Sequence, residues 1–210
     1  MTLGVIFVIA LVLSNLIAGK MTAVGGLALT AADFLFPLTY VLGDVFTEVY
    51  GFKNSRHIIW LGFGCNLFAV AGFQATVWLP APEFWHDQTA YATVFSTAPR
   101  ILFASLAGYL VGEFSNAAVL SRMKVMTRGR HLWARTIGSS VIGEALDTGI
   151  FATLAYFGTI PGKELIALML TQYIWKLLYE TALTPVTYIT VRRLKTVEGI
   201  DIYDRPLSPG

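Results

Sequence analysis

The chain has 210 residues, of which 55% are hydrophobic and 13% charged, and its mean hydropathy is +0.63. Soluble domains carry about 25% charged residues, so this composition excludes a large soluble domain and predicts an integral membrane protein. The formal net charge of +2 is too small to indicate nucleic-acid binding. Cys65 is the one cysteine, so an intrachain disulfide is excluded.

Apolar runs along the chain predict six transmembrane helices. Crossing about 30 Å of hydrocarbon takes roughly 20 apolar residues. Suitable runs occupy residues 3–19, 33–51, 56–79, 100–120, 136–157 and 165–191. The first run lacks the basic start and cleavage site of a secretory signal, so we expect a retained helix. The predicted fold is an all-α bundle of six spans over residues 1–195, followed by a tail over residues 196–210.

The basic residues predict the orientation of this bundle. They gather after the second span, after the fourth span and in the tail, whereas the opposite side holds only Lys20, Arg100 and Lys163. Cytoplasmic loops of membrane proteins are enriched in Lys and Arg. Both termini are therefore expected in the cytoplasm, and residues 80–99, which are aromatic and contain proline, are expected at the opposite surface.

Two spans carry small residues at steps of four. They are Ala10, Ser14 and Ala18 in the first span, and Ala104, Gly108 and Gly112 in the fourth. Small residues at this spacing let helix backbones approach closely. We expect helix packing at both stripes, and the first stripe is also a candidate docking face for a partner.

Polar residues that a bilayer should reject are the most informative feature. Asp44 and Glu48 stand one helical turn apart, so both leave the same helix face. A charge near the membrane centre costs roughly 2.5–3.5 kcal/mol on insertion scales unless it finds a polar interior. Similar stripes contain Asn15, Asn66, Gln74, Glu113, Asn116, Glu144, Asp147, Gln172, Lys176 and Glu180. Convergence of these stripes would build a polar chamber; the alternative is a set of structural interhelical hydrogen bonds.

Lys176 is the basic residue deepest in a predicted span, and two interpretations of it stay open. It stands four residues before Glu180, so the two could neutralise each other within one helix. It could instead meet acids from other helices, or a substrate carbonyl. In either case the acids outnumber their basic partners, so some must be protonated, hydrogen-bonded or hydrated.

Enzymatic interpretations find little support. All three histidines lie outside the predicted spans or at their starts, and the chain has no paired-cysteine motif and no phosphate-binding loop. An intramembrane protease using Asp44 and Asp147 is the alternative, but it leaves the other polar residues unexplained. We therefore predict a protein that is not an enzyme and that needs neither cofactor nor metal.

Several stretches resemble the bacterial queuosine precursor transporter family, also called the vitamin uptake transporter family. They are residues 36–51 (FPLTYVLGDVFTEVYG), 60–63 (WLGF), 109–116 (YLVGEFSN), 127–139 (TRGRHLWARTIGS) and 172–185 (QYIWKLLYETALTP). The resemblance runs in order along nearly the whole chain. It implies a multi-pass inner-membrane protein that imports 7-cyano-7-deazaguanine or its aminomethyl relative, and a likeness to the substrate-binding components of energy-coupling-factor transporters. The family is thought to act without a coupling ATPase.

The polar residues suit this cargo. A 7-deazaguanine is flat and offers adjacent N–H donors, which a carboxylate accepts in parallel, while an amide or lysine donates to the ring carbonyl. The predicted lining is Asp44, Glu48, Glu113, Asn116, Gln172, Lys176 and Glu180, with Asn15 and Asp147 as further candidates and Tyr40, Tyr173 and Trp175 as stacking partners. Proton coupling, passive transport and a partner ATPase stay open as energy sources, although we do not expect the ATPase. A homo-oligomer also stays open.

Overall fold

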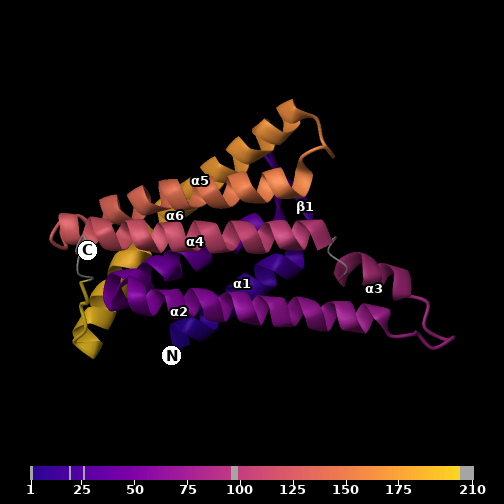
Figure 1. Ribbon diagram of the computed structural model, residues 1–210, viewed down its shortest axis with the longest axis horizontal. Helices are drawn as coiled ribbons and strands as arrows, with labels where there is room; N and C mark the ends of the chain where they lie inside the picture. Colours follow the sequence, from indigo (N-terminus) through magenta and orange to yellow (C-terminus); the bar gives the residue numbers. More distant parts are fainter. Residues whose placement is uncertain (1, 19, 26, 96–98, 204–210) are drawn as a thin grey trace, which may run out of the picture.

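The computed structural model describes residues 2–18, 20–25, 27–95 and 99–203, and it is a bundle of long helices with one small hairpin (Figure 1). The described helices are α1 (Thr2–Ile17), α2 (Pro37–Trp78), α3 (Gln88–Phe95), α4 (Pro99–Met126), α5 (Leu132–Tyr156) and α6 (Gly162–Glu198). The strands β1 (Met21–Val24) and β2 (Leu27–Thr30) and the 3-10 helix η1 (Ala31–Phe34) join α1 to α2. The predicted helical class is confirmed, and the hairpin is an addition to it.

The helix α2 contains two predicted spans, because the chain doubles back at Gly51 (Figure 1). Gly51 has φ 76° and ψ 166°, a conformation that residues with a Cβ rarely adopt. The Thr47 hydroxyl donates to the Ser55 hydroxyl at 2.8 Å, although eight residues of straight helix would span about 12 Å. Residues 37–50 and 52–78 are therefore two arms joined by a one-residue break, where we expected a loop over residues 51–55.

The first arm of α2 begins at Pro37, four residues later than expected. The Asp33 carboxylate accepts a hydrogen bond from the Thr30 backbone N–H at 2.7 Å, which holds the preceding residues in the 3-10 turn. Proline suits the first position of an α-helix, because its missing N–H has no partner there. Local capping and proline together set this boundary.

Small residues let α4 and α5 pack closely. Ala104 is fully buried. A Cβ added to Gly108 would lie 2.8 Å from the Asp147 side chain, and one added to Gly112 would lie 3.0 Å from the Gly143 carbonyl oxygen. The small-residue stripe predicted in the fourth span therefore has its expected effect.

The small-residue stripe of α1 also faces the bundle. Ala10 is 4% exposed and Ser14 is 1% exposed, and the Ser14 hydroxyl donates to the Ala10 carbonyl at 2.7 Å. Phe7 and Leu11, on the same helix, are fully buried. These two small residues are thus used in internal packing and offer no open docking face.

The surface and the interior are distributed as a bilayer requires. Large apolar side chains such as Phe68, Phe103 and Ile189 are exposed, whereas acids well within the helices, such as Asp44 and Glu113, are buried. Within the described residues, α2 and residues 103–126 of α4 are long and apolar enough to cross a membrane. The remaining predicted spans stay predictions, because α1 has 16 residues and α5 and α6 carry inward-facing polar residues that lower their hydropathy.

The two ends of the bundle differ (Figure 1). The Gly51 reversal, the α4–α5 turn and the described C-terminal residues lie at one end, which we call the basic end. The hairpin, α3 and the α5–α6 connection lie at the other, which we call the hairpin end. The helix α6 runs past the predicted span to Glu198, and residues 204–210 of the predicted tail lie outside the described residues.

Candidate functional site

Five of the buried carboxyl groups, from four helices, lie together inside the bundle. They are Asp44 on α2, Glu113 on α4, Glu144 and Asp147 on α5, and Glu180 on α6, each at most 4% exposed. With Lys176 of α6, which is 6% exposed, they form what we call the central cluster. The polar stripes predicted on these helices therefore face one another.

Lys176 connects α6 to α5. Its Nζ lies 2.6 Å from Oδ2 of Asp147 and 3.1 Å from Oε2 of Glu144. It also donates to the Thr148 hydroxyl at 3.2 Å and lies 4.9 Å from the centre of the Phe36 ring. Of the two interpretations left open, contact with acids of another helix is the one that the structure contains.

A hydrogen-bonded chain joins the remaining helices. The Asn116 amide donates to Oδ1 of Asp44 at 2.8 Å. The Ser140 hydroxyl makes a short hydrogen bond to Oε1 of Glu180 and lies 3.5 Å from Oδ1 of Asn116.

The central cluster has more acceptors than donors. Five acids face one lysine, which would give a net charge of −4 if all were ionised. Among the described residues, hydrogen-bond partners are lacking for the Tyr40 hydroxyl, Oδ2 of Asp44, Oε2 of Glu180 and both carboxyl oxygens of Glu113 and of Glu144. Unpaired buried polar groups are costly, so this arrangement suits protons, water or a solute rich in N–H groups.

Asp33 lies at the edge of the central cluster nearest the hairpin end. It is 3% exposed and accepts a hydrogen bond from the Gln172 amide at 3.4 Å. Its backbone carbonyl accepts a bond from the Trp175 indole at 2.9 Å, and Phe34 stacks edge-on against Trp175 at 5.3 Å. Sequence reasoning did not select Asp33 as a site residue, although the pattern Thr30-x-x-Asp33 is a capping signature.

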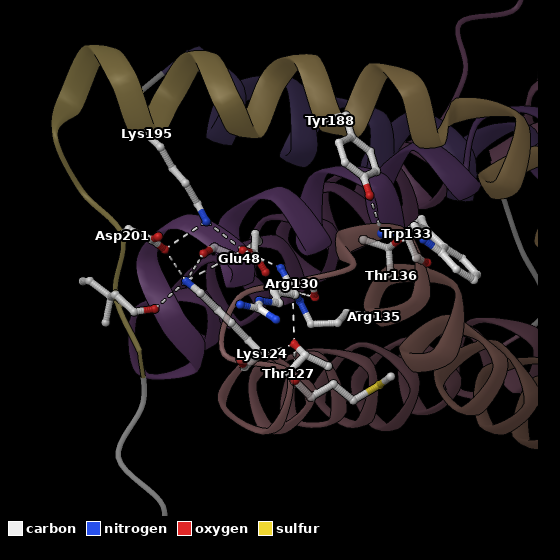
Figure 2. Close-up of polar contacts among 12 residues, drawn as sticks. Glu48, Lys124, Thr127, Arg130, Trp133, Arg135, Thr136, Tyr188, Lys195 and Asp201 are labelled. Carbon is white, nitrogen blue, oxygen red and sulfur yellow. Dashed lines mark hydrogen bonds and ion pairs between the residues drawn. The ribbon is translucent and has the colours of Figure 1, made fainter.

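Glu48 belongs to a second cluster, at the basic end (Figure 2). Its Oε1 lies 2.8 Å from Nη2 of Arg135, 2.7 Å from Nζ of Lys195 and 3.9 Å from Nζ of Lys124. Glu48 and Arg135 are each 1% exposed. We expected Glu48 in the same site as Asp44, but the structure places it outside the central cluster. Its partners are basic residues that we had used only to predict the orientation of the bundle.

The described part of the tail completes this Glu48 cluster. Lys124 donates to Oδ1 of Asp201 at 2.6 Å and to the Ile202 carbonyl at 2.7 Å, and the Ile202 N–H donates to the Val49 carbonyl at 3.0 Å. Partial burial raises the pKa of Asp201, but hydrogen bonds from Lys124 and Lys195 outweigh this effect and hold it below the ordinary value. Residues 200–203 thus close the basic end.

Three other predicted residues lie apart from the central cluster or at its edge. Asn15 is partly buried; its amide donates to the Leu11 carbonyl at 3.2 Å, and its oxygen accepts a bond from Ser105 at 2.7 Å. Tyr173 donates to the Val141 carbonyl at 3.2 Å. Trp175 donates to the Asp33 backbone carbonyl, whereas Tyr40 is fully buried among the acids of the central cluster.

The protease alternative needs two carboxyl groups that share one proton around a water molecule. Asp147 instead forms a close ion pair with Lys176, and Asp44 accepts a hydrogen bond from Asn116. The geometry therefore does not favour proteolysis.

An apolar groove of about 700 Å³ lies between α1 and the two arms of α2. Val8, Phe46, Ile58 and Leu61 are among its lining residues, and no member of the central cluster is. It offers few polar groups for a purine-like solute, so we do not assign the substrate to it.

Comparisons with known proteins agree with this architecture. Residues 30–190 match the family model described as "Putative vitamin uptake transporter". The chain belongs to this family. It is also 26% identical over 190 residues to the "Probable queuosine precursor transporter" of Bacillus subtilis (strain 168), covering 90% of this chain and 83% of the relative. No solved structure is significantly similar to the chain.

Membership in the vitamin uptake transporter family confirms the predicted transporter role and the prediction that the protein is not an enzyme. The acids and the lysine of the central cluster come from α2, α4, α5 and α6, the helices on which the sequence predicted polar stripes. Asp33, Ser140 and Thr148 join them unpredicted, because hydroxyl groups and a loop acid carry no distinctive spacing.

Proposed function

We propose that the protein imports a queuosine precursor, 7-cyano-7-deazaguanine or 7-aminomethyl-7-deazaguanine, across the bacterial inner membrane. In this proposal six spans cross the membrane, namely α1, the two arms of α2, α4, α5 and α6, with both termini in the cytoplasm. The clustering of basic residues at one end of the bundle supports this orientation. The name of the Bacillus subtilis relative supports the choice of substrate.

The unpartnered oxygens of Asp44 and Glu180 in the central cluster are the observation that carries the proposal. The Watson–Crick edge of a 7-deazaguanine has two adjacent N–H donors, and the free oxygens of Asp44 and Glu180 can accept them. Lys176 and Asn116 can donate to the ring carbonyl. We assign substrate contacts to these four residues, with Asp147 and Gln172 at the edges and Tyr40 beside the ring.

Transport requires the bundle to open alternately at each end, because the acids are buried in the present conformation. At the hairpin end, Asp33 with Gln172 and Trp175 forms the barrier. At the basic end, the barrier is the Glu48 cluster with residues 200–203. Hydrogen bonds and ion pairs of this kind can exchange between two discrete arrangements, as packed interfaces do in other switching proteins.

Thermal-shift measurements on detergent-solubilised protein test the proposal. A ligand that binds only the folded state stabilises it by about 2.7 kcal/mol at 100 times Kd, so 7-cyano-7-deazaguanine should raise the melting temperature clearly. Hypoxanthine, which lacks the exocyclic amine, should shift it far less, since buried acceptors would stay unpaired.

Variants locate the site within the same assay. Asp44→Asn and Lys176→Met should each abolish the ligand-induced shift, whereas Glu164→Gln, at an exposed acid in the first turn of α6, should retain it. A wild-type protein that shows no shift at saturating 7-cyano-7-deazaguanine would rule out the proposed substrate. A normal shift in both central-cluster variants would rule out the proposed site.

A further inference from the structure

Glu113 differs from every other acid of the central cluster. It is fully buried on α4, and neither of its carboxyl oxygens has a hydrogen-bond or ion-pair partner among the described residues, whereas Glu144, whose oxygens also lack hydrogen bonds, lies 3.1 Å from Nζ of Lys176. Oε2 lies 2.8 Å from the position that a Cβ on Gly43 would occupy, so the carboxyl group rests against the backbone of α2. A side chain at position 43 would displace it.

The neighbours of Glu113 offer it no cation. The titratable groups facing it are Tyr40 and Asp44 of α2, Tyr109 of α4, Glu144 and Asp147 of α5, and Glu180 of α6. Lys176 is engaged by the two acids of α5. Asp44 and Glu180 each receive a donor, from Asn116 and Ser140, so Glu113 alone has neither a charge partner nor a donor in the described part of the bundle.

Burying Glu113 in its ionised form would cost a large free energy in this environment. An ionised acid without hydrogen bonds is strongly disfavoured in an apolar interior, and other acids nearby add repulsion. Glu113 is therefore neutral in this closed conformation and holds a proton. The Tyr40 hydroxyl, which is also fully buried and lacks a hydrogen-bond partner among the described residues, is a second unsatisfied polar group beside Glu113.

We propose that Glu113 carries a proton inward together with the substrate, so that import is driven by the proton gradient. The inference rests on the proposed function and adds the energy source to it. Glu113 takes the proton from outside water when the hairpin end opens, and releases it to cytoplasmic water when the basic end opens. No covalent bond of the substrate changes, and one positive charge crosses with each neutral 7-cyano-7-deazaguanine.

Purified protein in proteoliposomes provides the test, with radiolabelled 7-cyano-7-deazaguanine as the probe. One pH unit, alkaline inside, should support up to about tenfold accumulation if one proton accompanies each substrate molecule. A protonophore should reduce this accumulation to equilibration. Addition of substrate outside should also acidify the lumen, as reported by an internal pH-sensitive dye.

The variant Glu113→Gln separates coupling from transport. Its amide imitates the protonated acid but cannot release a proton, so exchange of substrate across the membrane should persist while the ratio of uptake with and without the gradient falls to 1. Glu164→Gln should retain the wild-type ratio.

The outcomes distinguish the two proposals. Wild-type protein that binds and exchanges the substrate, but shows neither gradient-driven accumulation nor lumen acidification, would overturn the coupling and leave the transporter proposal intact. Gradient-driven accumulation by Glu113→Gln would overturn the role of Glu113. Absence of binding by the wild type would remove both proposals together. The dye measurement on wild-type protein decides the coupling even where Glu113→Gln fails to fold.

Discussion

Neutralising Glu48 should destabilise the protein more than neutralising any exposed acid. In the variant Glu48→Gln the side chain keeps its size but loses the charge that faces Arg135 at 2.8 Å and Lys195 at 2.7 Å. Arg135 is 1% exposed, so its guanidinium would stay buried without an acidic partner. Breaking a buried ion pair in this way typically costs about 3–5 kcal/mol.

The size of the expected shift follows from the chain length. For proteins of 150–250 residues, 1 kcal/mol moves the melting temperature by about 2–4 °C, so Glu48→Gln should melt roughly 10 °C below the wild type. Lys195 is 24% exposed and contributes less than Arg135, since water screens its charge. The shift should persist at 1 M salt, because buried pairs are screened little.

Glu198→Gln is the matched control for this measurement. Glu198 also lies at the basic end and accepts a hydrogen bond from the Tyr50 hydroxyl at 2.7 Å, but it is exposed. Its loss should cost less than about 1 kcal/mol. Melting followed by the fluorescence of a thiol-reactive dye or by retention in solution after heating gives the comparison. Equal melting temperatures for the two variants would refute the assignment of Glu48 as the centre of a buried cluster.

Three further outcomes are expected. Gly112→Ala should cost about 1–3 kcal/mol, because its Cβ would clash with the Tyr40 hydroxyl of α2 and lie 2.7 Å from Cβ of Asp147 on α5, whereas Gly149→Ala, with no atom within 4 Å, should be neutral or stabilising in the same melting assay. Gly51→Ala should cost about 1–3 kcal/mol through backbone strain at φ 76°, whereas Gly64→Ala, in open space on the second arm of α2, should not; equal melting would contradict the reversal at Gly51. The lowered pKa of Asp201 means that its pairing stabilises the tail above the unfolded value of 3.8 and is lost as the pH falls through the folded value. Hydrogen exchange of residues 200–203 should therefore accelerate only in strong acid, and Asp201→Asn should exchange fast at neutral pH.

The helices could largely be predicted, because the hydropathy of the chain indicates their extent and the small-residue stripe indicates where they pack. The sharp reversal at Gly51 was harder to predict, because a single residue with positive φ takes the place of the expected loop. The hairpin of residues 21–30 gave no clear alternation of polar and apolar residues, and its strands are only four residues long. Elements this short depend on the helices that hold their ends.

The site was predictable in its chemistry and less so in its membership. Spacing along a helix shows which side chains share a face, but not which neighbouring helix they meet. Asp44 and Glu48 share a face of α2, yet Asp44 meets Asn116 and Glu48 meets Lys124, two turns further along α4. The long lysine side chain reaches back toward Glu48, and this reach has no signature in the sequence.

The two clusters also differ in how well their charges are matched, and this difference separates their roles. At the basic end, Glu48 and Asp201 face Lys124, Arg135 and Lys195, so the charges of the acids there are matched by the protein itself, and Oε2 of Glu48 is the one buried carboxyl oxygen of this described cluster that lacks a hydrogen-bond partner. In the central cluster the acids exceed the single lysine, and several oxygens stay unpaired. A group that is already satisfied can hold a barrier closed, whereas an unsatisfied group gains from meeting a solute or a proton. The position of an acid along the chain does not reveal which kind it is; the number of donors that surround it does.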